Sequence, residues 1–465
     1  MAGLRLGFDA RQAVRAVACL GLLVMLGANL PGHLSYDSVA QLYEGHFHIR
    51  ETWGPALYAW VLGFFDQFVP GTSLYVAASG LIFFASLASL TDLRPRTRWI
   101  AVAVLAAVCL TPQVLIYQGI VWKDVMFANC AVAGAVLIAH AARDWGDARR
   151  RWTLLILALV LIAAGDQVRQ NGIIAGLFSA IAVGWLGALG GERRRWRRGV
   201  VWGLGALVAV LAVGALETRL SLPAKAPKET ATSTGIHIVQ TYDVIGASVL
   251  DPTYRLDILA AANPEAAQMV RERGKLDWSG RRVDFLDRDT VIQGPVNAIP
   301  DEAWSAQWFD LVLKHPATYL RVRFEDFRWV FLPPVIDWCL PVYVGVDAPA
   351  EKMAPLRLKH RFTQADVELV NYSSWFLGTP VMEHATYAAV ALLIAGLLLW
   401  RRQPVDIPIA GLQLAAAAFA ASFFIISIAC DYRYLYFTDL AAMVGLVYVA
   451  IDPPTPWRRR PEPAA

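Results

Sequence analysis

Long apolar runs separated by short polar segments dominate the chain. A helix needs about 20 mostly apolar residues to cross a bilayer, and ten runs come close to that length. They lie near residues 12–30, 73–90, 99–117, 125–141, 152–166, 172–190, 200–218, 381–400, 407–429 and 435–451. The pattern predicts an all-α polytopic membrane protein with about ten transmembrane helices. The first run lacks a small-residue cleavage site, so we expect a retained span and not a signal peptide.

The placement of the arginines gives the expected orientation. Charged residues make up 17% of the 465 residues, against about 25% in soluble proteins. Arginines concentrate at both ends of the chain and in the loops 91–99, 143–152, 191–198 and 401–404. With ten spans all of these segments fall on one side, which the positive-inside rule identifies as cytoplasmic. This distribution is typical of membrane topology and not of a nucleic-acid-binding surface.

One apolar segment, residues 54–69, is too short to be an obvious crossing. Counting it as a span would place the arginine-rich loop 91–99 on the outer side, against the positive-inside rule. We therefore predict that residues 54–69 form a helix that lies in the outer membrane interface or re-enters the membrane.

The long region 219–380 is the one soluble-looking part of the chain. It is long enough to fold as a small domain of its own, so we predict three parts: a transmembrane module 1–218, a mixed extracytoplasmic domain 219–380, and a transmembrane module with a cytoplasmic tail 381–465. Within the domain, residues 315–334 place apolar side chains at helical spacing with arginines between them, a pattern typical of a helix on the membrane surface. The residues are Leu320, Phe324, Phe327, Phe331, Arg321, Arg323 and Arg328.

The five cysteines form no Cys-x-x-Cys motif. Cys19, Cys109 and Cys130 lie inside apolar runs, whereas Cys339 and Cys430 lie in segments that we expect outside. A disulfide between Cys339 and Cys430 is one alternative, but the favoured interpretation is that all five cysteines are buried small hydrophobic residues.

Ionisable residues gather at the predicted outer ends of the spans. Asp37 follows the first span, Lys123 and Asp124 precede the fourth, and Arg433 precedes the tenth. The turn between the fifth and sixth spans carries Asp166, Arg169, Gln170 and Asn171. Ionisable groups at membrane depth cost a few kcal/mol each and mark functional sites by default. Because several separate loops carry them on one side, the sequence predicts a polar cavity that opens to that side.

Each of these residues also has a structural alternative. Asp37 could cap the helix that follows it, Lys123 could pair with Asp124, and Asp166 could pair with Arg169 at i, i+3 spacing. Residues 430–437 could form an interfacial aromatic belt.

Known motifs for metals and nucleotides are weak or missing. His46 and His48 lie two residues apart, with His33 nearby, and could ligate a metal. This is a weaker hypothesis, because no third ligand has a fixed spacing from that pair. The sequence contains no Walker loop, no dinucleotide fingerprint and no G-x-S-x-G motif.

Four blocks of the sequence resemble an uncharacterised bacterial branch of the C-type (GT-C) glycosyltransferase superfamily. They read PGHLSYDSVAQLY, VWKDVMFA, VRQNGI and DYRYLYF, in that order. The resemblance covers the first span to residue 220 and the last three spans, and says little about 219–380. The block TWGPALYAW departs from the branch at Gly54 and Ala56, so no role is carried over for the histidine usual there.

The resemblance implies an enzyme of the bacterial cytoplasmic (inner) membrane whose active site faces the extracytoplasmic side. Such enzymes transfer a sugar from a polyprenyl phosphate to a hydroxyl of a glycan, lipid or protein, generally with inversion. The two family acids map onto Asp37, as general base, and Asp124, which would orient Lys123 or position the acceptor. No cofactor or nucleic-acid partner is implied, and a divalent metal is left open.

The remaining site residues are expected to bind the substrates. The phosphate of the donor would be bound by Lys123, Arg433 and Arg169, and the substrates would be contacted by Tyr36, Gln41, Asn171, Tyr434 and Tyr436.

Two other classes of function compete with an enzyme. A transporter or flippase of a lipid-linked sugar would also need polar groups in a helix bundle, but it predicts inverted repeats and helices broken near the midplane. A structural membrane scaffold would tolerate loss of the Asp37 carboxylate.

Overall fold

The computed structural model describes residues 9–52, 54–190, 194–223, 231–281, 286, 290–333 and 339–453. These residues form helices joined by loops, with three isolated β-bridges and no strand among them. Eight of the described helices are long and apolar enough to cross a membrane. They are α1 (Ala10–Asn29), α4 (Ser73–Ser89, continued by η1, Leu90–Leu93), α7 (Lys123–Arg143), α8 (Ala148–Val168), α10 (Arg195–Ser221), α19 (His384–Arg401), α20 (Asp406–Ile426) and α21 (Tyr436–Ile451, preceded by η6, Tyr432–Leu435). The chain is thus an all-α polytopic membrane protein, as predicted.

Two of the ten predicted spans differ from a long straight helix. The run 99–117 is broken into α5 (Ile100–Cys109) and a second piece, α6 (Pro112–Leu115) with η2 (Tyr117–Gly119), and the two pieces are bent by 67°. Pro112 opens α6, where its missing N–H costs no helical hydrogen bond. The run 172–190 forms α9 (Ile173–Leu189), whose 17 residues are fewer than a usual crossing.

The two helices between α1 and α4 pack closely together. The predicted segment 54–69 forms α3 (Ala56–Asp66), whose 11 residues reach about 16 Å and are too short to cross a bilayer. It packs on α2 (Tyr36–Phe47). A Cβ atom at Gly45 would collide with the backbone of Ala59, and one at Gly63 would collide with the backbone of Gly45. The close crossing therefore requires both glycines.

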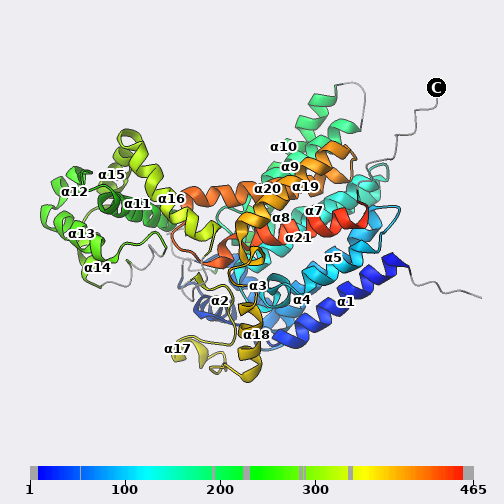
Figure 1. Ribbon diagram of the computed structural model, residues 1–465, viewed down its shortest axis with the longest axis horizontal. Coiled ribbons are helices and arrows are strands. Elements are labelled where there is room, and N and C mark those ends of the chain that lie inside the picture. The colour runs from blue at the N-terminus through cyan, green and yellow to red at the C-terminus, as the bar shows by residue number, and fades with distance from the viewer. Residues whose placement is uncertain are drawn as a thin grey trace, which may run out of the picture.

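The centre of the bundle is α7. In the apolar 18-residue stretch of α7 that could span a membrane, 94% of the residues are buried. The reason is that α7 packs against α4, α8, α20 and α21. Figure 1 shows these helices side by side, with α1 on one flank and α10 on the other. The first residues of α7 are therefore held in a fixed place at one end of the bundle.

The helices between α10 and α19 follow one another as α11 (Ala231–Leu250), α12 (Asp257–Ala262), α13 (Pro264–Asp277), α14 (Thr290–Asn297), α15 (Asp301–Lys314), α16 (Pro316–Phe331), α17 (Ala350–Met353), α18 (Gln364–Ser374) and the short η5 (Pro380–Met382). Helices α11–α15 lie to one side of the bundle (Figure 1) and have an apolar core of their own, which includes Trp304 and Leu311. The described part of 219–380 is helical, so the expected mixed character is not seen there.

Helix α16 was predicted as a helix on the membrane surface. The helix is present, but not all of its arginines are exposed. Leu320 and Phe324 are exposed, whereas Arg323 is fully buried and pairs with Asp243 and Asp326. The guanidinium of Arg323 also donates to backbone carbonyls at the end of α20. An alternating pattern could not reveal that this arginine faces inward, because its acidic partner Asp243 lies on another helix.

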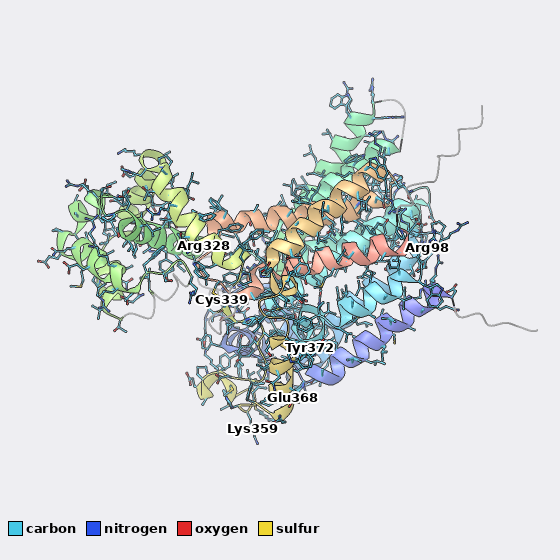
Figure 2. All side chains as sticks on the ribbon, in the orientation of Figure 1. Arg98, Arg328, Cys339, Lys359, Glu368 and Tyr372 are labelled. Carbon is cyan, nitrogen blue, oxygen red and sulfur yellow. A yellow bond between two sulfur atoms is a disulfide. The ribbon has the colours of Figure 1, made fainter. Side chains whose placement is uncertain are left out.

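The favoured interpretation of the cysteines is wrong, because Cys339 and Cys430 form a disulfide. Cys19 is exposed and Cys109 partly exposed, so only Cys130 is a buried free thiol. Figure 2 labels Cys339 at one end of the bundle and Arg98, from an arginine-rich loop, at the other end.

Candidate active site

Backbone pairing holds the loop after α1 against the loop that precedes α7. The N–H of His33 donates to the Gly119 carbonyl at 3.0 Å, and the N–H of Val121 donates to the His33 carbonyl at 3.0 Å. The indole N–H of Trp122 donates to Ser35 Oγ at 2.9 Å. Because Ser35 is the N-cap of α2, the first turn of α2 is fastened beside the first turn of α7.

Asp37 lies in that first turn of α2. The N-cap is Ser35, so the alternative in which Asp37 caps the helix is wrong. The Asp37 side chain is 55% exposed, and its Oδ2 accepts a hydrogen bond from Arg433 Nη1 at 2.7 Å. Partial burial acts to raise the pKa of Asp37, but the charges of Arg433 and Lys123 outweigh it and lower that pKa. The carboxylate is therefore ionised at neutral pH and reachable from solvent.

Arg433 joins two carboxylates that come from distant parts of the chain. It lies in η6, and its Nη2 is 3.5 Å from Oδ2 of Asp431 in addition to the bond with Asp37. Its guanidinium carbon lies 4.9 Å from the centre of the Trp122 ring, a distance at which a cation is attracted to an aromatic face. The side chain of Arg433 is 17% exposed, so the group is shielded but not sealed from solvent.

A second ion pair joins Asp124, in the first turn of α7, to Arg169, which follows α8. Asp124 is 3% exposed. The guanidinium carbon of Arg169 lies 5.3 Å from the centre of the Tyr434 ring. The alternative that pairs Arg169 with Asp166 is wrong, because the Asp166 carboxylate lies against Gly176 on α9.

Lys123 interacts electrostatically with the charges of both ion pairs. We call the resulting set the charge cluster; it consists of Asp37, Lys123, Asp124, Arg169, Asp431 and Arg433. Three cations face three carboxylates, so the cluster is formally neutral. The structure thus brings together the five charged site residues that the sequence predicts, from four separate segments.

Two of the predicted substrate-contact residues border the cluster. Tyr36 is 53% exposed and adjoins Asp37. Tyr434 is half-buried, stacks on Phe423 at 5.7 Å between ring centres, and lies under Arg169. Of the two, Tyr434 presents its ring to cations of the cluster, since Arg169 and Arg433 lie 5.3 Å and 5.9 Å from the ring centre.

The other three predicted contacts are hydrogen-bonded to other parts of the protein. Tyr436 is fully buried, and its hydroxyl donates to the Gln113 carbonyl at 2.9 Å and accepts from Gln118 at 2.8 Å. The predicted sugar contact through Tyr436 does not hold for this structure. Asn171 donates to Ser422 at 2.9 Å. Gln41 is buried on α2, and its amide donates to Thr52 Oγ1 at 3.0 Å and to Glu44 Oε2 at 3.2 Å.

A buried network behind Arg433 was not predicted. Tyr432 Oη donates to Asp439 Oδ2 at 2.6 Å and accepts from Gln113 Nε2 at 2.6 Å. His384 Nδ1 lies 2.7 Å from Asp439 Oδ1. These contacts fix Tyr432, the residue that precedes Arg433 in η6. Asp439 follows the quoted block DYRYLYF by two residues, but its partners on other helices leave no signal in a single sequence.

The predicted histidines do not form a metal site in the described part of the chain. No group of three histidine, cysteine or acidic side chains able to hold a metal occurs among the described residues. His33 Nε2 lies 2.9 Å from Asn29 Oδ1, and its Nδ1 accepts from the N–H of Gly345 at 2.9 Å. Burial, followed by the charge of Arg361, lowers the pKa of His33 to about 4. His33 is thus a neutral hydrogen-bonding residue between two loops.

Comparison with known proteins gives matches only among solved structures. No protein-family model matches the chain, and no curated protein matches it. The archaeal oligosaccharyltransferase AglB from Archaeoglobus fulgidus, in complex with an inhibitory peptide and a dolichol-phosphate, is 10% identical with a TM-score of 0.42. The Archaeoglobus fulgidus oligosaccharyltransferase in complex with Zn and sulfate is 12% identical with a TM-score of 0.44. The alignments cover 94% of this chain and 50% and 48% of those chains. The chain therefore spans about half the length of the structures that it resembles.

Proposed function

We propose that this chain is a membrane glycosyltransferase that transfers a sugar from a polyprenyl phosphate to an acceptor hydroxyl. The observation that carries the proposal is the contact of an exposed, ionised Asp37 with Arg433, inside a cluster that also holds Lys123. A base and two cations at one membrane face match the two requirements of this reaction, which are to deprotonate an alcohol and to stabilise a departing phosphate.

In the proposed reaction Asp37 accepts the proton of the acceptor hydroxyl while the oxygen bonds to the anomeric carbon. The bond from that carbon to the phosphate oxygen breaks, and polyprenyl phosphate leaves with the electron pair. One displacement inverts the anomeric centre. Positioned general bases contribute about 10²- to 10⁴-fold to such steps.

The cations would bind the leaving phosphate. A guanidinium can bind phosphate through two parallel hydrogen bonds, and an ammonium supplies a compact charge. Because Arg433 is paired with Asp37 in the ligand-free structure, a phosphate would compete with Asp37 for it. Withdrawal of Arg433 would raise the pKa of Asp37, so donor binding would make Asp37 a stronger base.

We place the site on the extracytoplasmic side of a bacterial cytoplasmic membrane, and two observations support the choice of side. Arg433 lies three residues after Cys430, whose disulfide with Cys339 is typical of an oxidising compartment. Arg98 and its arginine-rich loop lie at the other end of the bundle (Figure 2), as expected for a cytoplasmic side.

A flippase of a lipid-linked sugar is the second candidate, favoured by the break between α5 and α6. The ten residues of α5 reach about 15 Å, so the break lies near the middle of a bilayer about 30 Å thick. However, the Gln113 amide beyond the break already donates to Tyr432 and to the Val381 carbonyl. The Gln113 amide nitrogen beyond the break is therefore already bonded within the protein, which favours the enzyme.

The proposal can be tested by mass spectrometry of lipid-linked sugars and surface glycans from cells with and without the gene. A transferase predicts that loss of the gene causes a polyprenyl phosphate sugar to accumulate and one sugar to be missing from a glycan, lipid or protein. Unchanged lipid-linked sugars and unchanged surface glycans would contradict the proposal.

A further inference from the structure

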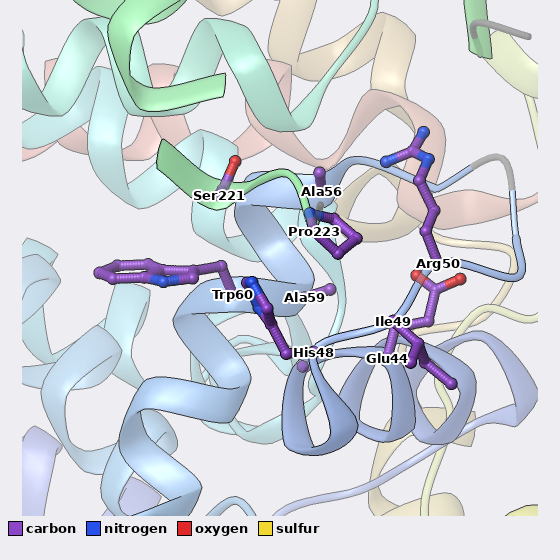
Figure 3. Close-up of a pocket in the computed structure, with 10 residues that line it drawn as sticks. Glu44, His48, Ile49, Arg50, Ala56, Ala59, Trp60, Ser221 and Pro223 are labelled. Carbon is purple, nitrogen blue, oxygen red and sulfur yellow. The ribbon is translucent and has the colours of Figure 1, made fainter. Parts of the chain in front are cut away.

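Two hollows of the described structure differ greatly in size. The one between the end of α2, α3 and the end of α10 (Figure 3) has a volume of about 10 Å³, which is room for about one water molecule. The other is a groove between α9 and α10 with a volume of about 480 Å³. Ligand pockets have volumes of roughly 300–1,000 Å³, so the groove is large enough for a ligand and the first hollow is not.

The groove follows the line along which α9 and α10 meet. Ala180, Gly184 and Ala188 recur every fourth residue on α9 and line it. A Cβ atom at Gly184 would come within 2.8 Å of the Gly199 carbonyl oxygen on α10. The two backbones are therefore close together at these small residues, and the larger side chains beside them form the walls of the groove.

The groove opens away from the helix bundle. Its walls include Ile181 and Trp185 on α9 and Val200 and Leu204 on α10, and all four side chains are about half exposed. Helices α9 and α10 lie at one flank of the bundle (Figure 1). Every residue that lines the groove is apolar, and exposed apolar surface on a spanning helix contacts lipid. The groove therefore suits a hydrocarbon chain.

The length of the groove matches one leaflet of a membrane. It extends from Trp196 to Leu207 on α10 and from Leu177 to Ala188 on α9. Eleven residues of helix rise by about 16 Å, and half of a hydrocarbon core about 30 Å thick is about 15 Å. Tryptophan is enriched at membrane interfaces, so the Trp196 end is the mouth of the groove and the other end lies near the midplane.

The mouth of the groove is basic. Exposed arginines occupy positions 194, 195, 197 and 198, at the N-cap and in the first turn of α10, and that turn contains no acidic residue. The guanidinium carbon of Arg197 lies 5.2 Å from the centre of the Trp196 ring. The start of a helix also carries unpaired N–H groups and a partial positive charge. This end of α10 is therefore complementary to an anion such as a phosphate.

We infer that the groove binds an anionic phospholipid of the leaflet on the arginine-rich side, with one acyl chain between α9 and α10 and the phosphate at Arg197. The 17 residues of α9 rise by about 25 Å and separate the mouth of the groove from Arg169 of the charge cluster. The lipid site is therefore distinct from the proposed donor site and does not rest on the proposed function.

The test measures lipid binding to the purified full-length protein in a neutral detergent. Native mass spectrometry would give the dissociation constant of the first bound lipid for phosphatidylglycerol and for phosphatidylcholine with the same acyl chains, which differ in net charge. Phosphatidylglycerol should bind at least about 10-fold tighter. Arg197→Gln should weaken phosphatidylglycerol binding about 5-fold and leave phosphatidylcholine binding nearly unchanged. Val200→Trp, which places an indole in the groove, should weaken the binding of both lipids at least about 5-fold.

Matched controls separate the groove from the general charge and apolarity of the surface. Arg149→Gln removes an exposed arginine at the start of α8, and Val201→Trp enlarges the exposed residue next to Val200; neither residue lines the groove. Both variants should bind the two lipids as the unaltered protein does. Equal affinity for the two lipids, or equal losses in Arg149→Gln and Arg197→Gln, would overturn the inference.

Two further outcomes would assign the groove to another occupant and also overturn the inference. One is tighter binding of farnesyl phosphate with displacement of phosphatidylglycerol, which would indicate an isoprenoid site. The other is a dimer that Val200→Trp dissociates without any change in lipid binding, which would indicate a second copy of this chain.

The same assay with Asp37→Asn separates this inference from the proposed function. Phosphatidylglycerol binding should be unchanged in Asp37→Asn, because the charge cluster lies at the other end of α9. If the unaltered protein prefers phosphatidylglycerol but never releases polyprenyl phosphate from a donor, the transferase is refuted while the lipid site stands. If it transfers sugar but binds both lipids equally, the lipid site is refuted while the transferase stands.

Discussion

At the scale of single residues, the shared guanidinium of Arg433 is the central feature of the site. It contacts Asp37 at 2.7 Å and Asp431 at 3.5 Å, and it lies over Trp122. A group that contacts two carboxylates and an aromatic ring has its orientation fixed before any ligand arrives, and a phosphate would have to compete with Asp37 for it.

This orientation predicts the effect of Arg433→Lys. An ammonium cannot reproduce two parallel hydrogen bonds to a phosphate, so turnover and donor affinity should each fall by about 10-fold. Folding should be preserved, because lysine keeps a positive charge beside Asp37 and Asp431. Sugar transfer and donor binding of the purified protein are the measurements.

The matched control for this prediction is Arg328→Lys, which alters an arginine paired with Glu325 at 2.6 Å and away from the cluster. It should leave both quantities unchanged. Equal donor binding and turnover for Arg433→Lys and the unaltered protein would show that Arg433 is only a structural ion-pair partner.

The lowered pKa of His33 leads to a prediction of how the free energy of unfolding depends on pH. Its pKa is lowered from 6.5 to about 4 in the folded protein, so between these values the unfolded chain binds more protons than the folded one. Stability should therefore fall as the pH drops from about 6.5 to about 4, by up to about 3 kcal/mol. The thermal midpoint of the purified protein, measured across this range, checks the prediction.

A His33→Gln variant isolates this contribution, since glutamine cannot take up a proton here. Its thermal midpoint should fall less steeply between pH 6.5 and pH 4 than that of the unaltered protein. Identical slopes would assign the acid sensitivity to other groups.

The charged residues of the site could be predicted one by one, but their neighbours could not. Asp37, Lys123 and Arg433 stand out because a charge at the end of an apolar run is costly. Tyr436 carries no such signal, since a tyrosine in η6–α21 can face either the outer surface or the bundle. Only the packing of Gln113 and Gln118 against it decides that it is buried.

At the scale of helices, the apolar pattern predicts where the helices are but not how they are interrupted. Each of the ten predicted spans contains a helix, because apolar length is sufficient to define one. The break at Pro112 has a local cause that the sequence displays. The buried pairing of Arg323 with Asp243 has no local cause, since it joins α16 to α11 across 80 residues of chain.

The disulfide between Cys339 and Cys430 leads to a prediction about the stability of η6. Cys430 lies three residues before Arg433 and is tied to Cys339, so the bond anchors the turn that carries the guanidinium. Cys430→Ala should lower the free energy of unfolding by about 2–4 kcal/mol and reduce sugar transfer. Thermal unfolding and transfer assays with Cys430→Ala and Cys339→Ala are the measurements.

The two single variants serve as controls for each other, because either one removes the same bond. The double variant should be no less stable than the worse single variant. Additive losses in the double variant would mean that the two cysteines act independently and that the bond does not support the site.

At the scale of the whole molecule, the account requires the charge cluster and the arginine-rich loops to lie on opposite sides of the membrane. A cysteine introduced at the exposed Ser374 should react with an impermeant reagent added outside intact cells, whereas cysteines at Gly146 and Gln403 should not. All three positions are exposed, so differences in reactivity report the side of the membrane and not burial. Labelling of Gly146→Cys from outside would invert the topology.

The measurement that tests the central claim most directly is sugar transfer by the purified protein in liposomes, with Asp37→Asn beside the unaltered chain. The unaltered chain should convert a polyprenyl phosphate sugar and an acceptor into a glycoside and free polyprenyl phosphate in equal amounts. Asp37→Asn should insert and fold normally, because the Asp37 side chain is 55% exposed, yet turn over at least about 10²-fold more slowly. Glu51→Gln, which alters an exposed outer carboxylate paired with Lys352, should transfer at the normal rate. Transfer by Asp37→Asn at the rate of the unaltered chain would contradict the account.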